Sequence, residues 1–314
     1  MLATLARRLA PLPVVLLVAS VVVFLLPRLA GVDTVRAVLR ARSAESMPDP
    51  AVAERITREL GLDASLPEQY LRWLGRVLQG DFGLSFATRT PVGPQLLDAL
   101  GVSALLAAVA VALAAAVGIP AGVLAARRPG GPLDRAVTGL SVLGVAVPEF
   151  ILAPVLVLGF AVALPLLPAT GWGGSADVVL PAVTLALFPA ALAAQLTRAE
   201  MLDVLARQHV VLARAKGLTE RRILWAHGAR LACTSVTSLS GMFFAGLLGG
   251  AVVVEVVFAL PGLGRLLYDA VIGQDLPMVQ AGLLAVIAVA VLASALADAL
   301  QLAADPVART RVGA

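Results

Sequence analysis

Six long apolar stretches run through this chain of 314 residues, and they restrict its possible folds more than any other feature. The hydrocarbon core of a bilayer is about 30 Å thick, and an α-helix needs roughly 20 apolar residues to cross it. Backbone polar groups inside a bilayer must bond within the protein, which favours helices. The sequence therefore predicts an all-α polytopic membrane protein with six transmembrane helices, at about 11–26, 101–126, 136–164, 178–196, 236–258 and 279–302.

The composition agrees with a membrane protein and argues against binding of nucleic acid. Hydrophobic residues make up 60% of the chain and charged residues 14%, against roughly 45–50% and 25% in soluble domains. The net charge of +4 arises from basic residues beside the apolar stretches, without a basic domain. The single cysteine, Cys233, excludes a disulfide framework, and His209 and His227 lack the spacing of zinc ligands, so we expect no metal site.

Basic residues in the short loops predict the orientation of the chain in the bilayer. With the N-terminus inside, the inner segments hold many arginines and Lys216, whereas the short outer loops near 165–177 and 259–278 hold only Arg265. Short cytoplasmic loops carry an excess of Lys and Arg. We therefore expect a multi-pass protein with both termini in the cytoplasm.

The apolar stretches also divide the chain into three parts. These are an N-terminal tail with the first span at 1–29, an extracytoplasmic segment at 30–100, and a core with five spans at 101–314. The outer segment has helical patterns at 48–62 and 67–78, followed by a turn at Gly80 to Gly83. This pattern predicts either a small folded cap or a plain linker.

The largest inner loop, about 198–230, predicts a helix-turn-helix. Its apolar residues up to Ala215 follow helical spacing, and Gly217 then ends the helix. Thr219 can cap a second helix, whose positive N-terminal end suits Glu220. An apolar stripe beside a basic face fits a helix on an anionic membrane surface, or a docking element that lies in the groove of a partner protein.

Two carboxylates and a glycine-rich turn are the candidate residues of a translocation pathway. Glu149 lies within the third span and can face a water-filled cavity. Glu255, near the outer end of the fifth span, is either a gate or channel residue or an interfacial carboxylate that pairs with Arg265. Non-helical backbone at this depth must be buried in protein or line water, so a re-entrant turn after Glu255 can gate a path. That turn contains Pro261, Gly262 and Gly264.

Short runs of residues, spread over most of the chain, resemble one family of membrane proteins. A-R-A-K-G-L at 213–218 and H-G-A-R at 227–230 are similar to the coupling loop of binding-protein-dependent ABC importer permeases of the dipeptide/oligopeptide/nickel type. Similar runs follow in the order of that family: V-F-L-L-P-R-L-A-G at 23–31, E-L-G-L-D at 59–63, G-D-F-G-L-S at 80–85, G-I-P-A-G-V-L-A-A at 118–126, L-P-A-V-T-L-A at 180–186 and E-V-V-F-A-L-P-G-L-G-R-L-L at 255–267. The resemblance includes the first span, which otherwise has the basic start and small residues of a cleaved signal peptide.

The resemblance implies the first of two permease subunits of an importer in the cell inner membrane, which carries peptides or similar small solutes by alternating access. Its partners would be a second homologous permease subunit, two cytoplasmic ATPase subunits that hold ATP and Mg, and an extracellular solute-binding protein. This chain would hold no cofactor and would not be an enzyme. In that family the coupling loop seats in a cleft of an ATPase subunit, here through Arg214, Ala215, Lys216, Gly217, Leu218, Glu220, Arg221 and Arg222.

Other functions stay open on the residues alone. An ion-coupled secondary transporter would need charge pairs within the spans and internal repeats, and neither is evident. A non-transporting membrane scaffold needs no such feature. The chain departs from the family at Leu231 and Ser235, where an asparagine and a proline are usual, and at His209, which replaces an aromatic residue. Because the family carries dipeptides, oligopeptides, nickel chelates, glutathione and sugars, the residues do not define the substrate.

Overall fold

The computed structural model describes residues 11–29, 61–225 and 230–304, together with the single residues 31, 35, 54, 55, 57 and 58. Every regular element in this part of the chain is a helix. Four helices are long and apolar enough to cross a membrane: α2 (Pro11–Leu29), α6 (Val92–Ala126), α9 (Val179–Leu205) and α15 (Leu276–Ala304). The predicted all-helical, multi-pass fold is thereby confirmed.

The third predicted span, 136–164, is bent in the structure. α7 (Pro132–Ala146) is followed by α8 (Glu149–Leu156) and the π-helix η1 (Val157–Ala163), and the two parts are bent by 104°. The bend has a local cause, because Pro148 disfavours helical backbone in the residue before it. Val147 accordingly takes φ −82° and ψ 114°. The two parts form one span only if the bent pair is counted together.

The fifth predicted span, 236–258, is also divided. α12 (Arg230–Gly250) and α13 (Val252–Val257) are separated at Ala251, and the chain then turns into α14 (Leu263–Ile272). The apolar part of α12, Leu239–Gly250, is shorter than a span. Among the described residues the structure thus has four membrane-crossing helices, or five with the bent pair, and the predicted count of six stays a prediction.

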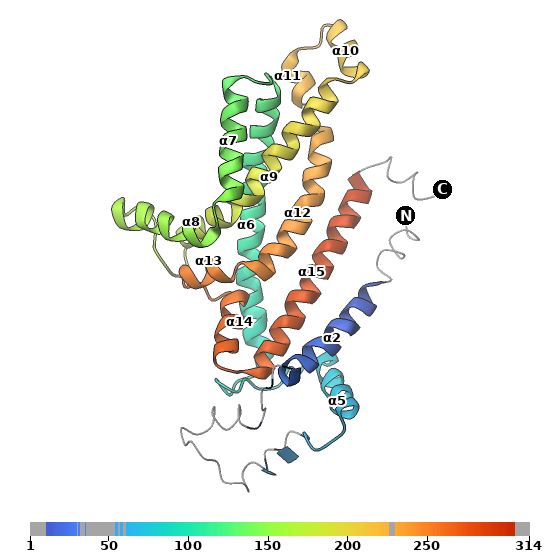
Figure 1. Cartoon of the computed structure of the whole chain (residues 1–314), viewed down its shortest axis with the longest axis vertical. Coiled ribbons are helices and arrows are strands. Elements are labelled where there is room, and N and C mark those ends of the chain that lie inside the picture. Colours follow the sequence, from blue (N-terminus) through green and yellow to red (C-terminus); the bar gives the residue numbers. More distant parts are fainter. Residues whose placement is uncertain are drawn as a thin grey trace.

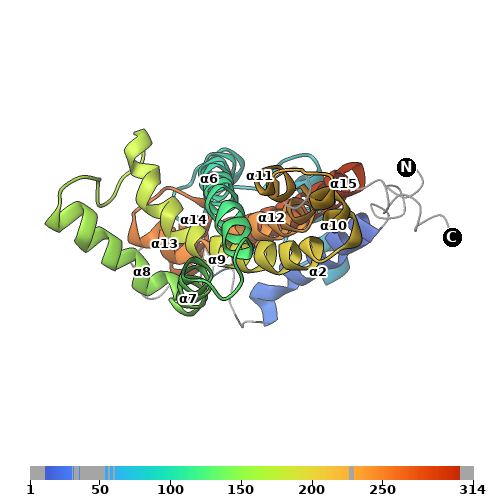
Figure 2. The ribbon, with the colours of Figure 1, turned by 90° about the horizontal axis from the view of Figure 1, so that it is seen from above.

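Long helices lie side by side and form the body of the molecule. α6, α9, α12 and α15 run along the longest axis, and α7 lies beside α6 and α9 (Figure 1). Two short helices, α10 (Gln208–Ala215) and α11 (Glu220–Arg222), lie at one end, and α5 (Leu66–Leu78) and α14 lie at the other. α8 projects from one side, away from α2 and α15 (Figure 2). The helix predicted at 67–78 is α5, whereas most of the helix predicted at 48–62 lies outside the described residues.

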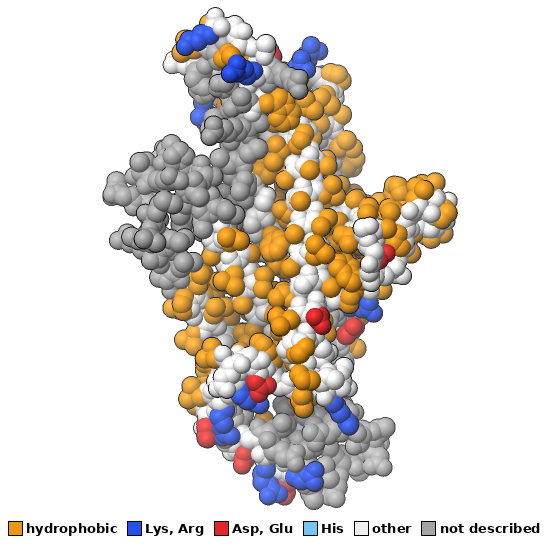
Figure 3. Space-filling model, turned by 180° about the vertical axis from the view of Figure 1, so that it is seen from behind, with side chains coloured by type: hydrophobic (Ala, Val, Ile, Leu, Met, Phe, Trp, Pro, Cys, Tyr) orange, Lys and Arg blue, Asp and Glu red, His pale blue; other side chains and the backbone are white. Residues whose placement is uncertain are grey.

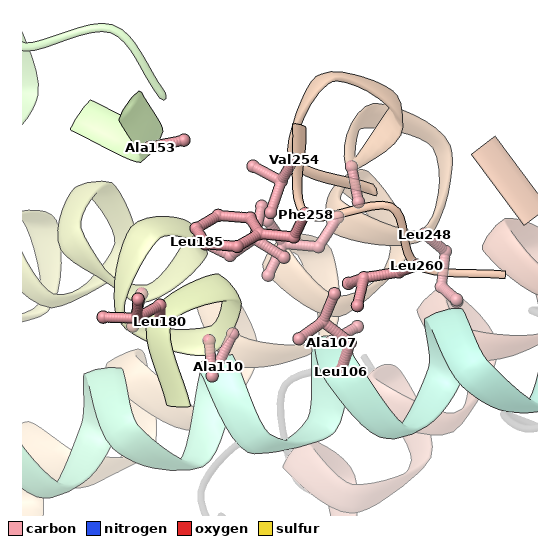
Figure 4. Packing of buried hydrophobic residues seen from close by; sticks show 14 of the residues in the cluster. Leu106, Ala107, Ala110, Ala153, Leu180, Leu185, Leu248, Val254, Phe258 and Leu260 are labelled. Carbon is pink, nitrogen blue, oxygen red and sulfur yellow. The ribbon is translucent and has the colours of Figure 1, made fainter. Parts of the chain in front are cut away.

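Buried apolar side chains from several helices meet at the centre of the body. One cluster contains Leu106 and Ala110 of α6, Leu185 of α9, Leu248 of α12 and Phe258 after α13 (Figure 4). These side chains are fully or almost fully removed from solvent. Because the cluster joins α13 to the long helices, it fixes the position of the chain that follows α13.

α6 and α9 approach each other closely where α6 carries glycine. A Cβ atom at Gly118 would lie 2.6 Å from the carbonyl oxygen of Ala190, and one at Gly122 would lie 2.5 Å from that of Ala194. Small residues four apart allow two helix backbones to approach in this way. The G-x-x-x-G run of this chain therefore packs two of its own helices against each other.

The surface carries a broad apolar band between two charged ends. On the face seen in Figure 3, hydrophobic side chains cover the middle of the molecule, and Lys, Arg, Asp and Glu gather toward its two ends. This distribution is typical of a protein whose middle contacts hydrocarbon while its ends reach water.

Candidate functional site

The chain forms a compact elbow, residues 206–222, directly after α9. It consists of α10, a turn at Gly217 and α11. Gly217 has a φ of +79°, a conformation that favours glycine, so the predicted glycine corner is confirmed. The first helix was predicted to run unbroken to Ala215, and this was wrong. Arg207 has extended backbone, with ψ 148°, and separates α10 from α9.

Apolar packing explains why the elbow folds back on α9. Val204 of α9, Val210 of α10 and Ile223 after α11 form one buried cluster, which a straight helix through Arg207 would not bring together. Two other apolar side chains of this region stay on the surface, since Leu212 is 60% exposed and Trp225 is 42% exposed. Sequence analysis did not single out Trp225. Large exposed apolar side chains next to basic ones are typical of a protein-docking surface.

An ion pair closes the elbow across its corner. The Arg214 guanidinium donates to both carboxylate oxygens of Glu220, from Nε at 2.7 Å and from a terminal nitrogen at 3.3 Å. These hydrogen bonds raise the pKa of Arg214 and lower the pKa of Glu220. Thr219 occupies the N-cap position of α11, but its side chain makes no capping hydrogen bond. Of the predicted coupling residues, the exposed ones are Arg214, Ala215, Lys216, Gly217, Glu220 and Arg222, Leu218 is half-buried, and the side chain of Arg221 lies outside the described part.

A second ion pair ties the helices that lead to the elbow. Arg198 of α9 binds both carboxylate oxygens of Asp134 in the first turn of α7, through Nε and, at 2.8 Å, through a terminal nitrogen. The N–H of Gly130 also donates to Asp134, at 2.8 Å. The ion pair of Arg198 with Asp134 therefore joins α9 to the turn between α6 and α7. Sequence analysis counted Arg198 only as an inner basic residue and did not identify Asp134.

At the opposite end of the molecule, Glu255 is fully buried and bonded to the beginning of α14. Ser103 of α6 donates from Oγ to its Oε1 at 2.5 Å, and the N–H of Arg265 donates to its Oε2 at 2.9 Å. Ser103 in turn accepts from the N–H of Leu263 at 2.8 Å. Glu255 was predicted to be a gate residue or to pair with Arg265. It contacts the Arg265 backbone only, because the guanidinium of Arg265 lies near Asp269, at 3.8 Å.

The predicted glycine-rich turn lies against this carboxylate. We call residues 252–272, which comprise α13, the turn and α14, the hairpin. A Cβ atom at Gly262 would overlap the Glu255 carboxylate, and one at Gly264 would lie 2.8 Å from the Cα of Val252. Glycine is thus required at both positions by close approach rather than by backbone conformation, whereas Pro261 of the same turn is exposed.

Asp275 is a third buried carboxylate, and sequence analysis missed it. It accepts from the Oγ of Ser85, from the N–H of Phe86 at 3.0 Å and from the N–H of Met278 in the first turn of α15 at 3.5 Å. Asp275 thereby joins the loop before α6 to the corner between α14 and α15. A signal was present, because an aspartate directly before an apolar helix is typical of an N-cap.

Glu149 differs from these carboxylates. It lies in the first turn of α8, after the bend at Pro148, and its side chain is partly exposed. Glu149 makes no hydrogen bond or ion pair with any residue that the structure describes. Glu149 and Glu255 therefore do not belong to one hydrogen-bonded network. A carboxylate without a bond to its own protein is available to water or to a solute.

Comparison with known proteins assigns nearly the whole chain to one family. Residues 118–310 match the family described as binding-protein-dependent transport system inner membrane component, and residues 1–107 match the N-terminal part described for such components. A protein of Brucella abortus, provisionally named a peptide transport system permease protein, is 39% identical over 98% of both chains. The glutathione transport system permease protein of Escherichia coli K12 is 35% identical over 96% of this chain and 97% of its own.

Proposed function

Since the chain belongs to the family of binding-protein-dependent transport system inner membrane components and is a permease subunit of an ABC importer, not an enzyme, we propose that it forms the translocation pathway for short peptides. The observation that carries this proposal is the similarity over nearly the full length to permeases named for peptide and for glutathione transport. Glutathione is itself a small peptide, so both names point to one class of solute. The pathway would open by alternating access, driven by ATPase subunits.

The proposed topology has six spans with both termini in the cytoplasm. The spans would be α2, α6, the bent pair of α7 with α8 and η1, then α9, α12 with α13, and finally α15. The elbow would lie in the cytoplasm, in line with its basic residues and with the positive-inside rule. Arg127, in the turn between α6 and α7, lies close enough to lower the pKa of Glu220, so two basic inner segments share one end of the molecule.

The elbow would be the part that receives the ATPase. Leu212 of the elbow and Trp225, three residues after it, are exposed apolar side chains that can enter a groove of the partner. Arg214 with Glu220 would hold the two short helices at a fixed angle. The complex would contain a second homologous permease and two ATPase subunits, with an extracellular solute-binding protein on the other side. ATP and Mg would bind to the ATPase subunits alone.

The hairpin would be the outer gate of the pathway. Glu255 is bonded to Ser103 and to the backbone of α14, which favours a role in holding the hairpin closed over direct contact with solute. Glu149 has no such bonds and would face the water-filled pathway. This assignment takes Glu255 as a gate residue rather than as the interfacial partner of the Arg265 side chain.

Two glycines at opposite ends of the molecule allow a matched test of the docking role. Gly217 in the elbow and Gly80 after α5 have φ values of +79° and +80°, and a Cβ atom at either would meet no atom within 4 Å. Gly217→Ala and Gly80→Ala therefore carry the same backbone cost. We expect Gly217→Ala to lower the yield of ATPase subunits that co-purify with the permease, and ATP-driven peptide uptake into proteoliposomes, more than Gly80→Ala does. Equal yields and uptake for the two variants, or reaction of a cysteine at 216 with an impermeant reagent outside the cell, would refute the proposal.

A further inference from the structure

α5 is an amphipathic helix whose apolar side is only half covered. Because successive residues turn by about 100° around a helix, its apolar residues form two adjoining stripes. One stripe holds Tyr70, Trp73 and Val77, and the other holds Leu71, Leu74 and Leu78. The side opposite to both carries Glu68, Gln69, Arg72 and Arg76.

α2 covers the first stripe. The ring of Phe24 in α2 lies 5.4 Å from that of Tyr70 and 5.5 Å from that of Trp73, measured between centroids. The hydroxyls of Ser20 and Tyr70 are 2.8 Å apart. In the second stripe Leu74 is half-buried, whereas Leu71 is 65% exposed and Leu78 is 78% exposed.

The contacts with α2 fix the depth of α5 in the membrane. α2 has 19 residues, which corresponds to about 28 Å and thus to nearly the whole hydrocarbon core. Ser20 precedes the end of α2 at Leu29 by nine residues, or roughly 13 Å along the helix. Tyr70 can reach Ser20 only if α5 lies beside the last turns of α2, level with one half of the bilayer rather than above it.

The polar groups around α5 fit the boundary of that half of the bilayer. Arg28, one residue before the end of α2, bonds to Gln69 of α5 and lies over the ring of Phe24, at 4.4 Å. Tyr and Trp are enriched where hydrocarbon meets the headgroups, and long Arg side chains extend from that depth toward phosphates and water.

We propose that α5 lies in the outer leaflet of the bilayer, with Leu71 and Leu78 against lipid acyl chains and Arg72 and Arg76 among the headgroups. The exposed Leu71 and Leu78 add to the apolar surface of α2, which exposes Val22 and Leu26 along the same half of its length. The choice of the outer over the inner leaflet rests on the proposed topology. The same helix leads, within ten residues, to the loop that Asp275 binds, so the lipid would anchor this loop and the corner between α14 and α15.

The placement of α5 in the leaflet can be tested with spin labels in the assembled importer in nanodiscs. The measurement is how often each label collides with two relaxation agents, one dissolved in lipid and one in water. The only cysteine, Cys233, is first replaced by serine, and single labels are attached at Leu78→Cys and, as a matched control on the polar side of the same helix, at Arg72→Cys. We expect the label at 78 to collide more with oxygen, which concentrates in lipid, and less with a water-soluble nickel chelate than the label at 72. Nickel accessibility at 78 equal to that at 72 would overturn the proposal.

Low collision with both agents at 78 would also overturn the proposal, because that result means that protein rather than lipid covers the stripe.

A second measurement of the depth of α5 needs no spin label. With Trp172 and Trp225 replaced by phenylalanine, Trp73 is the only tryptophan of this chain. In the permease chain alone, without the ATPase that Trp225 is proposed to contact, we expect brominated lipids to quench the fluorescence of Trp73. Failure of the ATPase to bind the elbow would leave both measurements unchanged, so the two proposals fail separately.

Discussion

Different kinds of contact stabilise the two ends of this permease. At the elbow end, α9 is joined to α6 through backbone contact at Gly118 and Gly122, and to α7 through the ion pair of Arg198 with Asp134. At the hairpin end, two buried carboxylates, Glu255 and Asp275, accept hydrogen bonds from the backbone of short helices and loops. Long helices meet at the first end, and short elements meet at the second.

This difference indicates how the two ends can work. Close packing of long helices makes a body that moves as one unit, which suits the transmission of force from the elbow. Short helices held by a few hydrogen bonds can separate when those bonds are lost, which suits a gate. Packed interfaces of this kind have discrete arrangements rather than a continuous range, so we expect the hairpin to be either closed or open.

Removal of the Glu255 carboxylate is expected to have the largest effect on stability. Glu255→Ala leaves the Ser103 hydroxyl and the N–H of Arg265 buried without an acceptor, and each unsatisfied group costs about 1–3 kcal/mol. We expect a loss of about 2–6 kcal/mol, measured as a lower midpoint of thermal unfolding in detergent. Glu255→Gln keeps one carbonyl oxygen and should lose less. An Ala variant as stable as the Gln variant would show that the hairpin does not depend on this acceptor.

Addition of one methyl group between α6 and α9 tests the close helix packing at the elbow end. Gly122→Ala puts a Cβ atom 2.5 Å from the carbonyl oxygen of Ala194, and overpacking of this kind costs about 1–3 kcal/mol. Because backbone blocks the methyl group, the helices must move apart, and we expect uptake per ATP hydrolysed to fall with stability. Gly139→Ala on α7 meets no atom within 4 Å and serves as the control. Equal uptake by the two variants would argue against a rigid elbow end.

Sequence analysis predicted well what depends on neighbouring residues. The length of the apolar stretches predicted the crossing helices, helical spacing predicted α5, and a glycine after a helical pattern predicted the corner at Gly217. The breaks at Pro148 and Ala251 were not predicted. A proline within an apolar run is tolerated in a membrane helix or bends it, and only the surrounding helices decide between these outcomes.

The bonds between distant residues could not be predicted from the sequence. Ser103 and Glu255 are separated by 152 residues, and Ser85 and Asp275 by 190. None of these residues stands in a periodic pattern that would indicate its partner. Charge suggested Arg265 as the partner of Glu255, and the structure instead uses the Arg265 N–H. Backbone donors at helix ends are identical for all residues except proline, so composition does not reveal them.

The ion pair of the elbow end can be tested by double substitution. Asp134→Asn leaves Arg198 without its counter-ion, and Arg198→Gln does the reverse, so each single variant should lower uptake per ATP hydrolysed. We expect the double variant to be no worse than the worse single one, because residues that act as a pair are not additive. The effect on thermal stability should be smaller than that of Glu255→Ala, since Arg198 is partly exposed. Additive losses would mean that the two residues act separately.

The smallest effect on stability, and the sharpest contrast between the ends, is expected from a pair of exposed Arg–Glu contacts, one at each end. Arg214–Glu220 in the elbow and Arg72–Glu68 in α5 have similar N–O distances, 2.7 Å and 2.8 Å. Exposed pairs of this kind contribute little to folding, so Glu220→Gln and Glu68→Gln should unfold at nearly the same temperature as the unmodified chain. Only Glu220→Gln should weaken binding of the ATPase, measured as the concentration of ATPase that half-saturates the permease.

The pH dependence of that binding provides an independent check. Because hydrogen bonds from Arg214 lower the pKa of Glu220, the pair is intact above the ordinary titration range of glutamate and is lost only as the pH falls through the lowered value. Titration of this pair should therefore leave ATPase binding by the unmodified chain unchanged between pH 6 and pH 8. The Gln variant should bind the ATPase more weakly by a similar factor throughout that range. If the weaker ATPase binding of Glu220→Gln disappears at either end of this range, the effect comes from another group. In that case the Arg214–Glu220 pair does not set the angle of the elbow.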